Sequence, residues 1–140
     1  MDHNAIFGPV LAMLVLTIIV WVYMFAKRMP WIQSANLTPE QFKPGEFEKA
    51  QPDDVLNPSS NFKNLFEIPI LFYVICGYLF MSGTVDMMYV VGAWVFVASR
   101  FAHSFVQCTF NHVMTRFMVY LLGALVVFAM IGCAVFQFLM

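Results

Sequence analysis

Residues 117–140 read FMVYLLGALVVFAMIGCAVFQFLM, and only Gln137 interrupts their apolar pattern. An α-helix rises about 1.5 Å per residue, so about 20 mostly apolar residues suffice to cross the hydrocarbon core of a bilayer. This stretch meets that length without help from any neighbouring residue. It therefore predicts a membrane-spanning helix.

Three further apolar stretches precede it, at residues 5–26, 65–83 and 87–99, and the last can continue as a helix to residue 108. The second and third reach spanning length only if polar residues at their ends lie inside a helix bundle. We therefore predict an all-α integral membrane protein with a four-transmembrane-helix bundle. The expected single domain covers residues 1–140, with helices at about 5–28, 58–83, 86–108 and 113–139 and a loop at about 29–57.

The composition excludes several classes of protein. Of the 140 residues, 61% are hydrophobic and 11% are charged, whereas a typical soluble domain is about 45–50% apolar and about 25% charged. The 16 Phe residues exclude a disordered chain, and a net charge of −1 predicts no nucleic-acid partner. The three cysteines are far apart in the sequence, and we expect each to be a free thiol packed among apolar side chains. His103 and His112 have no carboxylate beside them, so we expect no metal site.

The cationic residues are distributed unevenly along the chain. Every Lys and Arg lies in or beside the first and third connections, at positions 27, 28, 43, 49, 63, 100 and 116. Cytoplasmic loops of membrane proteins carry the excess of Lys and Arg. We therefore expect both termini on the non-cytoplasmic side of the membrane.

The first connection contains local turn signals. Thr38-Pro39-Glu40-Gln41 is typical of a helix start, with Thr38 as the cap and Gln41 completing a capping box. Pro44-Gly45 is expected to end that helix within about one turn. Asn57-Pro58 predicts the cap and first residue of the second spanning helix.

Polar residues recur at helical spacing where the second span enters the membrane. Ser60, Asn64 and Glu67 fall at i, i+4 and i+7, which predicts one polar stripe on a helix. A carboxylate at membrane depth is costly and usually faces a bundle interior or a wet cavity. Pro69 lacks a backbone donor and is expected to leave the carbonyl of Leu65 free for another partner.

A second stripe lies at the end of the third span, where Arg100, His103 and Gln107 fall at i, i+3 and i+7 and Ser104 flanks them. Arg116 opens the fourth helix on the same side of the membrane, with Tyr120 one turn further on. We predict that these groups line a polar pocket at the cytoplasmic membrane boundary.

Each of these residues, taken alone, also has a structural explanation that requires no ligand. Glu67 and Arg100 would form a buried ion pair that fixes helix register. Arg116 would reach lipid phosphates as an anchor, and His103 would be a satisfied packing residue. The convergence of all of them on one side and one depth favours the pocket.

These motifs resemble those of the membrane-associated proteins in eicosanoid and glutathione metabolism, the MAPEG family. The resemblance covers nearly the whole chain and rests on four elements in order. They are the basic end of the first helix at Lys27-Arg28, the Asn-x-x-Glu pattern at Asn64 and Glu67, the Arg-x-x-His-hydroxyl pattern at Arg100, His103 and Ser104, and Arg116 with Tyr120.

The resemblance implies a homotrimer that binds glutathione between subunits at the cytoplasmic boundary. It implies that Arg116 is catalytic and favours the glutathione thiolate, and that Arg28 comes from the neighbouring subunit. A lipophilic electrophile or lipid hydroperoxide would reach the thiolate from the surrounding lipids. The implied glutathione-binding residues are Arg28, Lys63, Asn64, Glu67, Arg100, His103, Ser104 and Tyr120.

The chain also departs from the family pattern. Ser60 stands where an arginine is common, Gln107 where a tyrosine is common, and Phe117 where the prostaglandin synthase has a serine. A point charge at Lys63 does not replace a bidentate guanidinium. These departures motivate a second hypothesis, a non-enzymatic MAPEG-fold protein that binds a lipid or joins a larger membrane complex. The compact chain resembles bacterial members, which implies a bacterial inner membrane.

Overall fold

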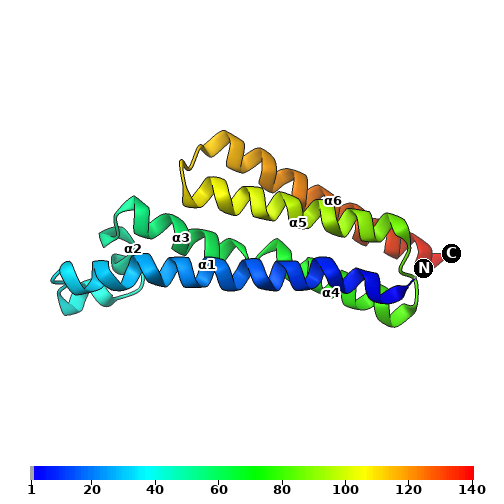
Figure 1. Cartoon of the computed structure of the whole chain (residues 1–140), viewed down its shortest axis with the longest axis horizontal. Helices are drawn as coiled ribbons and strands as arrows, with labels where there is room; N and C mark the ends of the chain where they lie inside the picture. Colours follow the sequence, from blue (N-terminus) through cyan, green and yellow to red (C-terminus); the bar gives the residue numbers. More distant parts are fainter. Residues whose placement is uncertain (1) are drawn as a thin grey trace.

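The computed structural model describes residues 2–140, and within them every regular element is a helix (Figure 1). In chain order the elements are η1 (His3–Ile6), α1 (Phe7–Ser34), η2 (Pro39–Phe42), α2 (Glu46–Ala50), α3 (Asp53–Asn64), α4 (Ile68–Ser82), α5 (Met87–Cys108) and α6 (Val113–Leu139). Four helical segments are long and apolar enough to cross a membrane: His3–Ser34, Asp53–Ser82, Met87–Cys108 and Val113–Leu139. The prediction of four spanning helices is confirmed.

The helices form one elongated bundle (Figure 1). α5 and α6 pair as an antiparallel hairpin with the most extensive contact in the molecule, while α1 packs along α3 and α5. Both termini lie at one end of the bundle, which we call the terminal end. The opposite end carries α2 and the turn between α5 and α6, and we call it the loop end.

The bundle buries apolar side chains from every spanning helix. Met13 of α1, Phe72 of α4, Phe96 of α5 and Val127 of α6 are all fully buried. The rings of Phe72 and Phe96 stack with their centroids 4.5 Å apart. Large apolar side chains also cover the outside of the bundle, a distribution that suits lipid rather than water as the surrounding solvent.

The second span differs from the predicted helix at about 58–83. It begins at Asp53, so Pro58 lies inside α3 instead of at its start. Asp53 and Asp54 occupy the first turn, where the partial positive charge of a helix N-terminus favours carboxylates. The expectation that Asn57 caps this helix is therefore wrong.

The same span is interrupted between α3 and α4. Pro69 has no N–H to donate to the carbonyl of Leu65, and Glu67 precedes α4 with φ −100° and ψ −104°. The predicted continuous stripe of Ser60, Asn64 and Glu67 is wrong, because Glu67 lies in the break between the two helices, where the helical spacing no longer applies. Glu67 is exposed on the surface of the single chain.

The first connection is shorter than the predicted loop of 29–57, because α1 continues to Ser34. Trp31 stabilises this extension by packing against Phe47 of α2, with ring centroids 5.5 Å apart. The capping box of Thr38 is present at the start of η2, where its backbone N–H donates to Gln41 Oε1 at 2.8 Å. η2 ends before Pro44 and Gly45 as predicted, and Gly45 has φ 85°, whereas the short helix α2 that follows was not predicted.

Gly123 of α6 sets how closely α5 and α6 approach. A Cβ at this position would lie 2.5 Å from Ser99 Oγ, and that hydroxyl donates to the carbonyl of Phe96 at 2.6 Å. Membrane helices use small residues where their backbones come close. We expect Gly123→Ala to lower the free energy of unfolding by about 1–3 kcal/mol through overpacking, measured by thermal unfolding in detergent.

Gly132→Ala is the matched control on the same helix, because a Cβ there would meet no atom within 4 Å. We expect this variant to keep the stability of the native chain or to gain slightly, since alanine favours helix more than glycine does. Equal losses in the two variants would show that close packing at Gly123 is not the cause.

Candidate functional site

The buried polar residues of the bundle gather on the loop-end half of α5. Arg100 is 1% exposed, His103 2%, Ser104 4% and Gln107 2%. Their spacing places them on one face of the helix, and that face points into the bundle as predicted. A charged side chain this deep in an apolar bundle is costly unless something compensates its charge.

Arg100 lies between two aromatic rings. Its guanidinium carbon is 5.3 Å from the ring centroid of Phe96 and 4.7 Å from that of Tyr120. Both distances fall in the range of cation–π attraction. None of its three guanidinium nitrogens has a hydrogen-bond partner within residues 2–140. The ring of His103 lies 5.8 Å from that of Tyr120, centroid to centroid.

Glu67 forms no ion pair with this cation within residues 2–140. It is exposed, and the ion pairs found within residues 2–140 join other residues. The alternative of a buried Glu67–Arg100 pair that fixes register is therefore absent here. The structure leaves Arg100 as a desolvated guanidinium with free N–H donors, a group suited to an anionic ligand.

A seam of hydrogen bonds joins α3 to α5 beside this cation. Ser104 Oγ donates to Asn61 Oδ1 at 3.2 Å, and Asn61 Nδ2 donates to Cys108 Sγ at 3.5 Å. Asn64 Nδ2 donates to Gln107 Oε1 at 3.2 Å. The seam fixes the register of the two helices and occupies one donor of Asn64. Asn61 was not among the predicted residues, although its spacing of three residues from Asn64 places it on the same side of the helix.

Removing Asn61 should destabilise the bundle, because its side chain is fully buried and bonds two partners. We expect Asn61→Ala to lower the free energy of unfolding by about 1–3 kcal/mol, since it leaves the Ser104 hydroxyl unsatisfied. Thermal unfolding in detergent measures this loss. Ser60→Ala, at the partly exposed neighbour, is the control and should leave stability unchanged.

Arg116 lies in the first turn of α6 and is held by the preceding turn. Its Nη1 donates to Asn111 Oδ1 at 2.6 Å, and Asn111 Nδ2 donates to Asn57 Oδ1 of α3 at 3.0 Å. His112 caps α6 by accepting from the backbone N–H of Thr115. Asn111 was not among the predicted residues. Its place in a short connection between two helices could have indicated a structural role, since asparagine tolerates the left-handed backbone region that such turns use.

The other two candidate cations are engaged elsewhere at the loop end. Arg28 Nη2 donates to Ser59 Oγ of α3, and its guanidinium carbon lies 5.7 Å from the ring centroid of Phe47. Lys63 forms an ion pair with Glu48 of α2. Thus α5 and α6 bring Arg100, His103 and Tyr120 together. Within one chain, Arg28 and Lys63 contact the first connection and α3 instead.

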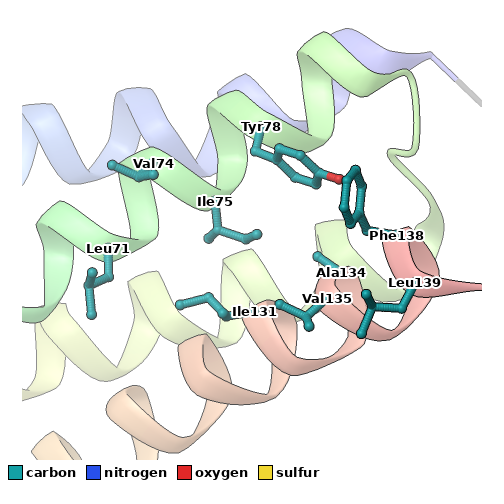
Figure 2. Close-up of a pocket in the computed structure, with 9 residues that line it drawn as sticks. All are labelled: Leu71, Val74, Ile75, Tyr78, Ile131, Ala134, Val135, Phe138 and Leu139. Carbon is teal, nitrogen blue, oxygen red and sulfur yellow. The ribbon is translucent and has the colours of Figure 1, made fainter.

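An apolar groove lies elsewhere on the surface. It has a volume of about 410 Å³ between α4 and α6 at the terminal end, and the side chains that line it include Leu71, Ile75, Tyr78 and Phe138 (Figure 2). The lining part of α6 begins at Ile131, 15 residues beyond Arg116, which is about 22 Å along a helix. This groove is therefore separate from the polar residues around Arg100, His103 and Tyr120. Within residues 2–140, no group of three His, Cys, Asp or Glu side chains could hold a metal ion.

Within the described residues, four membrane-length helices and a buried guanidinium without a hydrogen-bond partner define a small polytopic membrane protein with a candidate anion site. The sequence pattern of the MAPEG family matches residues 6–136 of the chain, so this protein belongs to the MAPEG family. The comparisons with curated proteins and with solved structures found no match. Membership of the family supports a glutathione-related transferase, peroxidase or related membrane function in general terms.

Proposed function

We propose that this protein is a glutathione-dependent transferase or peroxidase that acts on lipophilic electrophiles or lipid hydroperoxides. Glutathione would bind between subunits of a homotrimer at the cytoplasmic face of a bacterial inner membrane, with both termini on the opposite side. In the transferase reaction the thiolate sulfur bonds to the electrophilic carbon and the leaving group departs. In the peroxidase reaction two glutathione molecules are oxidised to the disulfide while the hydroperoxide is reduced to alcohol and water.

The observation that carries this proposal is the unpaired guanidinium of Arg100 beside His103 and Tyr120. Glutathione presents two carboxylates and, after ionisation, a thiolate. A buried guanidinium with free donors forms charge-assisted hydrogen bonds to such anions, which are about twice as strong as neutral ones. The aromatic ring of Tyr120 packs against the guanidinium of Arg100 and helps to keep it in place.

Arg116 supplies the second part of the chemistry. A free thiol has a pKa of about 8.5 and is mostly protonated at neutral pH, and only the thiolate is a good nucleophile. A fixed cation next to the sulfur favours the anion. Arg116 is partly exposed at the start of α6, where an electrophile dissolved in the surrounding lipids can reach it between helices.

The proposal requires more than one chain for two reasons. Glu67 is exposed on the single chain, so we expect it to hold the amino group of glutathione at a surface that another subunit closes. Arg28 contacts Ser59 and Phe47 of its own chain, and its role toward a neighbour's glutathione needs the subunit interface. Closed symmetry would give equivalent sites at each interface.

Calorimetry with the purified full-length protein in detergent tests the proposal. Glutathione is compared with ophthalmic acid, an analogue that carries a methyl group in place of the thiol, and thiolate absorbance is followed in parallel. We expect both ligands to bind and only glutathione to produce a thiolate signal at neutral pH. Absence of binding at millimolar glutathione would refute the proposal.

One observation favours a second function. Asn64 and Lys63 already have partners inside the chain, namely Gln107 and Glu48, which leaves fewer groups for glutathione. A cationic cluster at the membrane boundary also suits a phospholipid head group. In this alternative the protein is not an enzyme and binds a lipid or joins a larger membrane complex. Native mass spectrometry that detects only bare oligomers, without lipid or partner, would contradict it.

A further inference from the structure

We infer that Asn111 is a positioning residue that holds Arg116 in the site and links it to α3 through Asn57. The inference rests on the proposed function insofar as Arg116 acts on a bound thiol. It goes beyond that function because it assigns a role to two residues outside the family-like motifs.

The turn between α5 and α6 is built around Asn111. Its backbone has φ 45°, in the left-handed region that few residues other than glycine and asparagine adopt readily. Its N–H donates to the carbonyl of Val106 at 2.8 Å and so closes the end of α5. This conformation directs the side-chain amide between Asn57 of α3 and Arg116 of α6.

Both polar atoms of the Asn111 side-chain amide form hydrogen bonds. The carbonyl oxygen accepts from Arg116 Nη1 at 2.6 Å, and the NH₂ group donates to Asn57 Oδ1 at 3.0 Å. The Asn57 bond restrains rotation of the amide, so its oxygen keeps facing the guanidinium. The chain of contacts thus joins α3, the turn and α6 although 54 residues separate Asn57 from Asn111.

Arg116 needs such a restraint for three physical reasons. The first turn of a helix carries partial positive charge, which repels a guanidinium. A free arginine side chain at a membrane boundary extends toward lipid phosphates and water. Ordering a long side chain such as that of arginine also costs rotamer entropy. The carbonyl oxygen of Asn111 offsets these costs with a hydrogen bond to a charged group.

Three variants of the full-length protein separate the two hydrogen bonds. Asn111→Gly keeps the left-handed backbone and removes both bonds. Asn57→Ala removes only the outer bond. Asn57→Asp is the matched control, because its carboxylate oxygen still accepts from Asn111 Nδ2.

The first readout needs no glutathione. Phenylglyoxal modifies free guanidinium groups, and mass spectrometry of peptides gives the rate at each arginine. We expect the rate at Arg116 to rise roughly tenfold in Asn111→Gly, the ratio for loss of one hydrogen bond to a charged group. A smaller rise is expected in Asn57→Ala, and the native rate in Asn57→Asp. Arg28, which bonds Ser59, is the internal reference and should not change. Unchanged rates at Arg116 would overturn the inference.

The second readout is the pH at which bound glutathione forms its thiolate. We expect the midpoint to rise in Asn111→Gly, because Arg116 spends less time beside the sulfur, while glutathione affinity changes less than the midpoint. If Arg116→Ala shifts the midpoint and Asn111→Gly does not, the positioning role is wrong and the proposed function stands. If Arg116→Ala leaves the thiolate unchanged, the proposed function fails, and the phenylglyoxal rates still decide whether Asn111 restrains Arg116.

Discussion

Arg116→Ala should reduce glutathione-dependent turnover of a lipophilic chloronitroarene by about 10²–10³-fold, the loss typical for one preorganised group that stabilises developing or formed negative charge. Arg116 is the cation at the start of α6 and is held by Asn111. Without it the bound thiol should titrate near its ordinary pKa of about 8.5. Thiolate absorbance at neutral pH should therefore disappear and return only as the pH rises.

Two controls distinguish a catalytic loss from a binding or folding defect. Ophthalmic acid has no thiol, so its affinity for Arg116→Ala should change far less than turnover. Arg116→Lys retains a positive charge without the planar donor pair, and it should show a smaller rise in the titration midpoint. Native thiolate absorbance in Arg116→Ala at neutral pH would remove Arg116 from the chemistry and refute the proposed function.

Arg100→Met should stabilise the protein and weaken its binding of glutathione. The guanidinium is 1% exposed and has no hydrogen-bond partner within the described residues. Replacing buried charged groups by apolar residues of similar volume is often stabilising by about 1–4 kcal/mol. The same change removes hydrogen-bond donors for an anionic ligand. Loss of hydrogen bonds to a charged group costs about 1.5–3 kcal/mol, so the affinity for glutathione should fall roughly 10–100-fold.

Thermal unfolding without ligand and calorimetry with glutathione measure the two effects separately. Arg116→Met serves as the stability control, because Arg116 is partly exposed and bonds Asn111, so no gain in stability is expected there. A loss of stability in Arg100→Met would mean that stacking on Phe96 and Tyr120 outweighs the cost of burying the charge. Unchanged glutathione affinity would exclude Arg100 from the site.

Local sequence patterns were sufficient to predict much of the architecture. The four spans follow from hydrophobic length, and the capping box at Thr38 follows from side chains only three residues apart. The inward face of α5 follows from helical periodicity, since Arg100, His103 and Gln107 share one side of a regular helix. Each of these features depends on neighbours in the chain, which the sequence displays directly.

The second span shows where local pattern was insufficient. Spacing placed Glu67 on a stripe with Asn64, yet Glu67 lies in the break before α4 and is exposed. Pro69 was visible as a residue without a donor, but whether a proline kinks, interrupts or merely bends a helix depends on what packs around it. The start of this span also differs from the prediction. It was expected at Pro58 but lies at Asp53, because Pro58 is accommodated within the first turns of α3.

The sequence by itself therefore determined the membrane class, the number of spans and the polar face of α5, because hydrophobic length and helical period are properties of consecutive residues. Only the tertiary structure decided which polar groups pair. Asn61 meets Ser104 across 43 residues, and Asn57 meets Asn111 across 54. Within residues 2–140 the guanidinium of Arg100 has no hydrogen-bond partner, and Glu67 is exposed in the break between α3 and α4. Such pairings depend on how helices distant in the sequence pack against one another, and no periodicity within one segment encodes them.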